Sequence, residues 1–144
     1  MTVIDLARNP VIVSHGAAHR VTTDLADDQI RALAATGGLI GIHFFTTYLG
    51  PDPAPEDVVN QIDYIAQLVG IDHVALGVDF FPTQGPWRDL QVAQGTTDLR
   101  WAIDDMGGMP RVTHALVKHG LSETDIRKIL GENFIRVCHA VFVT

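Results

Sequence analysis

Residues 11–14 read Val-Ile-Val-Ser, a short and mostly β-branched apolar run bounded by Pro10 and Gly16. A run of this length and composition predicts a strand that is buried on both faces. Residues 39–45 and residues 74–80 repeat the apolar pattern further along the chain. The chain therefore contains three candidate strands of the fully buried kind.

Two helical segments separate these strands. Residues 25–36 carry two aspartates in the first turn and end at Gly37, and residues 55–69 begin with Pro-Glu-Asp and keep one apolar stripe until Gly70. Apolar strands joined by amphipathic helices predict a β-α-β-α-β unit with a parallel sheet that is covered on both faces. We expect an α/β protein and treat residues 1–144 as one domain.

The last part of the chain has a different pattern. Residues 82–108 are rich in Gly, Gln, Thr and Pro and predict a long loop, which is usually functional or mobile in a compact domain. Residues 111–119 predict a helix, and Ser122 predicts the start of another. Apolar residues on both sides of Gly131 predict either a helical hairpin or a bent helix.

Composition restricts the class of protein. A hydrophobic fraction of 47% with 19% charged residues is typical of a folded globular chain. The formal net charge of -7, with ten scattered Lys and Arg, argues against a nucleic-acid partner. We expect no membrane span, because no long apolar run is present. The first residues show no signal peptide, and the single Cys138 excludes an internal disulfide, so we expect a cytoplasmic location.

Polar residues stand at the carboxyl ends of the predicted strands, where parallel-sheet enzymes place their chemistry. His15 follows the first strand, and Asp79 closes the third inside an apolar run. A histidine and a carboxylate that converge at one edge of a sheet are typical of metal-assisted hydrolysis. Each also fits a structural role on its own, as a hydrogen-bonded histidine and as an aspartate that caps a turn.

Two further residues are candidates for substrate binding. His43, in the second predicted strand, either lines a substrate pocket or is a core histidine with satisfied hydrogen bonds. Arg20, in the loop after the first strand, either contacts a substrate carboxylate or is solvated. The sequence contains no phosphate-binding glycine motif, Gly-x-Ser-x-Gly elbow or His-Glu-x-x-His helix.

Four segments resemble motifs of the membrane dipeptidases, a zinc metallopeptidase family that includes renal dipeptidase. They occur in the family's order over nearly the whole chain. The segments are residues 10–15 (PVIVSH), 36–42 (TGGLIGI), 77–80 (GVDF) and 129–137 (ILGENFIRV).

The resemblance implies a (β/α)8 TIM-type barrel with two zinc ions that hydrolyses dipeptides, and it maps this chain onto the last three strands and the closing helices. It implies that His15 is a ligand of one zinc and that Asp79 handles the proton of the attacking water. The family's other zinc ligands have no counterpart here. Phe81 replaces the second carboxylate of the family's Gly-x-Asp-Phe-Asp, and Arg20 is a substitute candidate for the arginine that binds the substrate carboxylate.

We therefore expect the carboxyl-terminal part of a zinc dipeptidase, since 144 residues fall short of the roughly 250 of a complete barrel. A partial barrel leaves open sheet edges, so we expect a homo-oligomer or pairing with a complementing half-barrel. Two alternatives stay open. The chain is a non-catalytic half-barrel that binds or supports a partner, or it performs a related amidohydrolase-type reaction on an amide or lactone.

Overall fold

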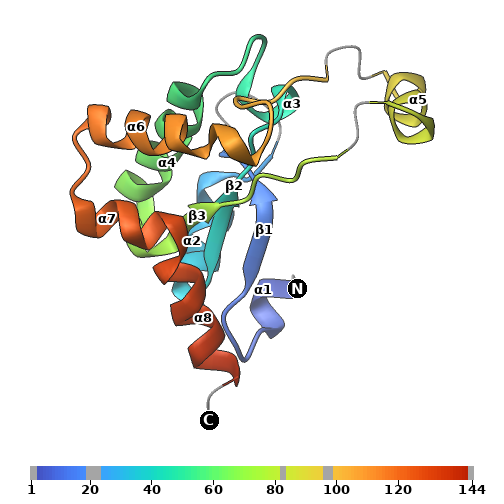
Figure 1. The fold of residues 1–144 in the computed structure, drawn as a ribbon. Coiled ribbons are helices and arrows are strands. Elements are labelled where there is room, and N and C mark those ends of the chain that lie inside the picture. Colours follow the sequence, from blue (N-terminus) through green and yellow to red (C-terminus); the bar gives the residue numbers. More distant parts are fainter. Residues whose placement is uncertain (1–2, 19–23, 82–83, 96–98, 143–144) are drawn as a thin grey trace.

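A three-stranded parallel sheet organises the chain (Figure 1). The computed structural model describes residues 3–18, 24–81, 84–95 and 99–142. The strands, which lie in the order β1-β2-β3, are β1 (Ile12–Gly16), β2 (Leu39–Ile42) and β3 (Val74–Leu76). The central strand pairs in parallel with both neighbours. The predicted α/β class with three parallel strands is confirmed.

The strands differ from the prediction at their ends. β1 runs two residues further than predicted, whereas β2 and β3 end three and four residues earlier. His43 and Asp79 therefore lie in the loops after β2 and β3 and not within strands. Burial also differs between strands. All four residues of β2 are buried, as predicted, but β1 is an edge strand that exposes 37% of Ile12.

Both predicted crossover helices are present, as α2 (Asp27–Ala35) and α4 (Pro55–Val69). The remaining helices are α1 (Val3–Leu6), α3 (Thr46–Leu49), α5 (Pro86–Ala93), α6 (Met109–His119), α7 (Glu123–Arg127) and α8 (Asn133–Phe142). None of the helices that the structure describes combines the length and the apolar character needed to cross a membrane.

The prediction of one long loop over residues 82–108 is wrong in part, because α5 forms inside it. This helix begins at Pro86, a favourable first helical residue, and it buries none of its side chains. Figure 1 shows α5 away from the sheet. Without a buried face there is no apolar stripe to reveal such a helix in the sequence.

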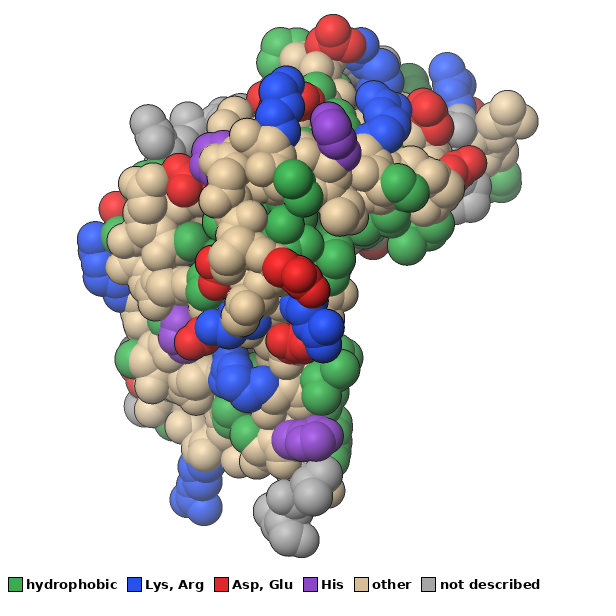
Figure 2. Space-filling model, turned by 60° about the vertical axis from the view of Figure 1, so that its left-hand side comes forward, with side chains coloured by type: hydrophobic (Ala, Val, Ile, Leu, Met, Phe, Trp, Pro, Cys, Tyr) green, Lys and Arg blue, Asp and Glu red, His purple; other side chains and the backbone are tan. Residues whose placement is uncertain are grey.

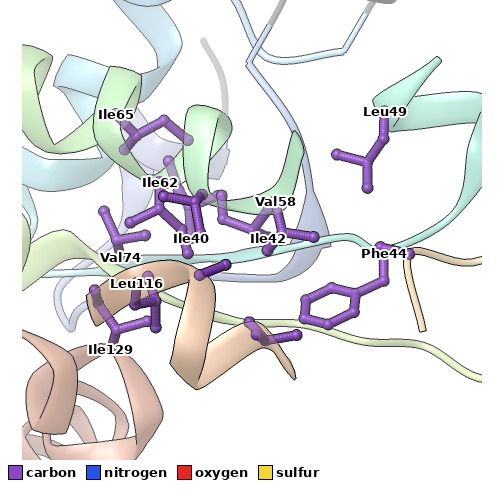
Figure 3. Close-up of a cluster of buried hydrophobic side chains, with 14 of the residues drawn as sticks. Ile40, Ile42, Phe44, Leu49, Val58, Ile62, Ile65, Val74, Leu116 and Ile129 are labelled. Atoms are coloured by element: carbon purple, nitrogen blue, oxygen red, sulfur yellow. The ribbon is translucent and has the colours of Figure 1, made fainter. Parts of the chain in front are cut away.

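The hydrophobic core lies between β2, α4 and α6 and continues to the segment before α8 (Figure 3). Burying a large aliphatic side chain contributes about 1.5–3 kcal/mol, so this cluster supplies much of the driving force for folding. The residues labelled in Figure 3 are Ile40, Ile42, Phe44, Leu49, Val58, Ile62, Ile65, Val74, Leu116 and Ile129.

The carboxyl-terminal helices contact the amino-terminal end of the sheet and form hydrogen bonds with it. Ser122 caps α7 as predicted, by accepting a hydrogen bond from the backbone of Asp125. The chain then bends near Gly131 into α8, so the bent-helix alternative is correct. The side-chain amide of Asn133 donates to the carbonyls of Ile71 and Val74 at 2.8 Å each, immediately before and at the start of β3.

Charged side chains of both signs lie side by side on the face shown in Figure 2. The ion pairs of the structure include Lys128 with Asp72 at 2.7 Å and Arg127 with Glu132 at 2.8 Å. Each of these pairs is largely exposed, so each contributes little to stability.

Candidate functional site

A β-bulge in β1 sets the direction of His15. Val13 pairs with Ile40, but the next pairing joins Gly16 to Ile42, so two residues of β1 stand opposite one residue of β2. Bulges of this kind re-aim side chains and are common next to active sites. His15 is one of the two bulged residues.

Two glycines in the neighbouring chain segments make this bulge possible. A Cβ atom added at Gly41 in β2 or at Gly77 after β3 would collide with the carbonyl oxygen of Ser14. Glycine at both positions lets the backbone of the bulge approach its neighbours closely. The glycines of two resemblance segments therefore have a structural task, which is to support the segment that presents His15.

The imidazole of His15 has one nitrogen engaged and one available. Its Nδ1 lies 2.9 Å from the hydroxyl of Ser14, and its Nε2 lies 3.8 Å from Oδ2 of Asp79. The side chains of His15 and Asp79 are 44% and 41% exposed, so both are open to a ligand from solvent.

Asp79 has a strained backbone. Its φ is 52°, in the left-handed region, where side chains other than glycine cost roughly 1–2 kcal/mol and where aspartate is among the better tolerated. Strain of this kind is concentrated at functional sites. The sequence suggested a buried carboxylate at this position, but the structure shows one that is half-exposed, because β3 ends before it.

His43 lies deeper than the other two and is only 2% exposed. Its Nδ1 is 3.0 Å from the backbone nitrogen of Phe45, and its Nε2 is 3.2 Å from Oδ2 of Asp79. Its ring stacks on the ring of Tyr48, with 4.3 Å between the ring centroids. Burial lowers the pKa of His43 below the ordinary histidine value. The attraction to Asp79 raises this pKa, but by less than burial lowers it. The imidazole is therefore neutral at neutral pH.

The three side chains form one group at the carboxyl-terminal end of the sheet. One ligand-type atom from each of His15, His43 and Asp79 lies within 4.8 Å of the others. His15 and Asp79 thus face a common site, as the sequence analysis expected, and His43 joins them. Imidazole nitrogen and carboxylate oxygen are atoms that zinc accepts as ligands.

An aromatic cavity of about 270 Å³ opens beside His43 and Asp79. Its other lining residues are Phe45, Thr47, Tyr48, Phe81, Trp87 and Gln91. Trp87 and Gln91 come from α5, so the helix that the sequence did not reveal contributes a wall of this cavity.

Arg20 lies outside the described residues, so the prediction that it binds a substrate carboxylate stays a prediction. The chain on both sides of that segment is held in place. Ala17 donates to the carboxylate of Asp24, and Ala18 donates to Oε1 of Gln61 at 3.0 Å. Gln61 is 5% exposed, and the sequence analysis missed it. The signal was available, since Gln61 is a polar residue within the apolar stripe of α4.

The family model that matches this chain, over residues 1–143, is that of the membrane dipeptidases, peptidase family M19. A dipeptidase, AtaJ of Aspergillus terreus, is 30% identical over 96% of this chain. Among solved structures, an amidohydrolase from Pseudomonas aeruginosa matches 99% of this chain with a TM-score of 0.87 and 26% identity. A metallopeptidase from Rhodobacter sphaeroides, liganded with a phosphinate mimic of the dipeptide L-Ala-D-Ala, matches 97% with a TM-score of 0.77 and 28% identity.

This chain spans only part of each relative. It covers 32% of the Aspergillus dipeptidase, 49% of the Pseudomonas amidohydrolase and 38% of the Rhodobacter metallopeptidase. The match nevertheless includes every element that builds the site, from the bulge of β1 to the segment that carries Asp79. The chain belongs to the membrane dipeptidase family, peptidase family M19.

Proposed function

We propose that this chain carries part of the active site of a zinc-dependent dipeptidase, with His15 as a metal ligand and Asp79 as the carboxylate that handles the proton of the attacking water. The observation that carries the proposal is the distance of 3.8 Å between Nε2 of His15 and Oδ2 of Asp79 at the carboxyl-terminal edge of the sheet. Family membership supports a dipeptidase-like hydrolase.

His15 is suited to hold a metal ion. When Nδ1 donates to the Ser14 hydroxyl, Nε2 keeps its lone pair for a metal ion, and Nε2 lies on the side of Asp79, 3.8 Å from Oδ2. A histidine ligand whose second nitrogen is fixed by a hydrogen bond is the usual arrangement in zinc sites, because the bond sets the tautomer and the ring orientation.

Asp79 is placed to move a proton. A zinc ion bound at this site would supply an acidified water and would polarise the amide carbonyl. The carboxylate of Asp79 accepts a proton from the attacking water and returns it to the amine that leaves. Because the carboxylate is half-exposed, a substrate can reach it directly.

The substrate proposed is a dipeptide. The aromatic cavity beside Asp79 is small and can take one apolar side chain. The Rhodobacter relative binds a mimic of L-Ala-D-Ala, which supports a small peptide with small side chains as the first substrate to test. Arg20 is proposed to bind the carboxylate of this peptide.

The remaining ligands are proposed to come from a complementing half-barrel or from a second copy of the chain. Catalytic zinc normally has three protein ligands, and among the described residues only His15, His43 and Asp79 form a group that could hold an ion. In the described sheet, β1 and β3 each have one unpaired edge. Exposed apolar side chains on α8, among them Phe134 at 51% and Phe142 at 79%, support burial against a partner.

Zinc titration calorimetry and hydrolysis of L-Ala-D-Ala with added zinc test the proposal. We expect zinc binding that His15→Ala removes and that His114→Ala, a matched change at an exposed histidine on α6, leaves intact. Hydrolysis, where present, is lost in Asp79→Asn. A folded chain that binds zinc equally with and without His15 would overturn the proposal.

One observation favours the alternative of a non-catalytic module. Phe81 occupies the position at which the resemblance predicts a second carboxylate. Its ring packs against Trp101 and Phe45, with ring centroids 4.7 Å and 5.3 Å apart. A protein that stays folded, binds no zinc and hydrolyses no dipeptide would support this alternative.

A further inference from the structure

The three-membered group of His15, His43 and Asp79 suggests three metal ligands, but the two histidines differ in which nitrogen atoms are free. A nitrogen that ligates a metal must offer its lone pair, and a neutral imidazole has one such nitrogen. The hydrogen-bond partners of each ring therefore decide whether it can ligate.

The lone pair of His43 is already used. The backbone N–H of Phe45 donates to Nδ1 at 3.0 Å. Since a backbone amide is a donor only, Nδ1 must be the acceptor and carries no proton. The proton of the neutral ring is then on Nε2, 3.2 Å from Oδ2 of Asp79, which can only accept it.

From this geometry we infer that His43 is not a metal ligand but the positioning residue of the site, which donates Nε2–H to Oδ2 of Asp79 and orients that carboxylate. The inference rests on the proposed role of Asp79. His15 can take the opposite arrangement, since its Nδ1 faces a hydroxyl that can accept a proton and its Nε2 is 3.8 Å from Oδ2 of Asp79, beyond hydrogen-bond distance.

The surroundings of His43 hold its ring in this orientation. The ring stacks on Tyr48 with an interplanar angle of 20°, and the side chain is 2% exposed, so a flip would expose neither nitrogen to water. Such a flip would replace Nδ1 by Cδ2–H and Nε2 by Cε1–H, leaving the N–H of Phe45 without its acceptor and the carboxylate of Asp79 without its donor.

Orientation of Asp79 matters because its backbone is strained. At a φ of 52° the residue lies in a loop that no strand hydrogen bond fixes, and the donor from His43 holds one carboxylate oxygen, Oδ2. With Oδ2 held by His43, Oδ1 is the oxygen that we assign to take the proton of the attacking water. His43 acts on the reaction only through Asp79.

Nuclear magnetic resonance of protein labelled with ¹⁵N at histidine tests the inference without an activity assay. At about pH 8, above the ordinary histidine pKa, we expect His43 to show the Nε2–H tautomer, with the resonance assigned by its loss in His43→Gln. Excess ¹¹³Cd should then produce a cadmium–nitrogen coupling at His15 and none at His43.

The Nδ1–H tautomer at His43, or a cadmium coupling to its ring, would overturn the inference. Failure of the proposed function looks different, because cadmium would then couple to neither histidine while the tautomer of His43 stayed as inferred. The tautomer is measured in the metal-free chain, so it is decided in either case.

A pair of variants provides a second readout. The side-chain amide of His43→Gln can donate to Asp79, whereas His43→Leu cannot. We expect both variants to keep zinc affinity within about tenfold, because His43 contacts Asp79 and not the ligand His15, whereas hydrolysis, where present, should fall about 10–100-fold in His43→Leu and less in His43→Gln. Equal and complete loss of binding in both variants would identify His43 as a ligand and contradict the inference.

Discussion

The two ends of the sheet differ in how their polar groups are used. At the amino-terminal end, Asn133 and Arg136 donate to four backbone carbonyls, at distances of 2.8 to 2.9 Å. At the carboxyl-terminal end, His15 and Asp79 are half-exposed and the backbone of Asp79 is strained. In β/α barrels the first end serves stability and the second serves chemistry, and this chain shows the same division. Substitutions at the two ends should therefore have separable effects.

The largest loss of stability is expected from Asn133→Leu at the amino-terminal end. The buried amide donates to the carbonyls of Ile71 and Val74, so its removal takes one donor from each, and the Ile71 carbonyl keeps only the backbone N–H of Val74. We expect a loss of about 2–4 kcal/mol in the free energy of unfolding, measured by urea denaturation. The control is Asn60→Ala on the exposed face of α4. A loss below that of the control would contradict the anchoring role of Asn133.

Gly41→Ala should have the next largest effect. It is expected to change both the stability of the sheet and the binding of zinc. The new Cβ would press on the carbonyl of Ser14, so we expect a loss of about 1–3 kcal/mol from overpacking. Because the bulge that carries His15 must move, zinc affinity should fall as well. Gly70→Ala, where a Cβ meets no atom within 4 Å but φ is 97°, is the control for backbone strain without a clash. Unchanged zinc binding in Gly41→Ala would show that the bulge does not position His15.

Asp79 allows a test of the backbone strain at the carboxyl-terminal end. Both Asp79→Gly and Asp79→Ala remove the acceptor of the buried His43 Nε2–H, but only glycine relieves the left-handed strain, so Asp79→Gly should have a free energy of unfolding about 1–2 kcal/mol higher than Asp79→Ala. Both variants should lose dipeptide hydrolysis. Thermal unfolding of the two variants side by side is the measurement, and equal stability would show that the backbone at Asp79 is not strained.

The smallest effect is expected from the exposed pair of Asp72 and Lys128 at the amino-terminal end. The hydrogen bond from Lys128 holds the pKa of Asp72 below its ordinary value of 3.8. The folded pKa is depressed, so the stabilisation is present above the ordinary pKa and disappears as the pH falls through the folded one. Asp72→Asn should therefore be less stable than the wild type above about pH 5 and equally stable in strong acid. A difference that persists in acid would point to a cause other than this charge pair.

The parts of the fold that depend on local sequence could be predicted. The helices α2 and α4 carry their own acidic first turns and apolar stripes, and Ser122 caps α7 through a partner three residues away. The helix α5 could not be predicted in this way, because it buries no side chain. Periodicity reports burial, so it cannot report a helix that stands away from the core.

For the site, the sequence could predict which residues take part but not how they are arranged. Strand ends identified His15 and Asp79, and these residues do lie together. The sequence could not show that the strands end before His43 and Asp79, because those ends depend on contacts between distant segments. The ring orientation of His43 likewise depends on Phe45 and Asp79 together, and residue type alone did not distinguish a substrate-binding histidine from one that orients a carboxylate.

The most direct measurement is the position of zinc in a crystal of this chain soaked with the ion, located by anomalous diffraction at the zinc edge. A peak about 2.0–2.1 Å from Nε2 of His15, the usual zinc–nitrogen distance, on the side that faces Asp79, is the predicted result. A fully loaded crystal with no peak at His15, or with zinc only at a surface pair such as His119 and Asp63, would contradict the proposed metal site.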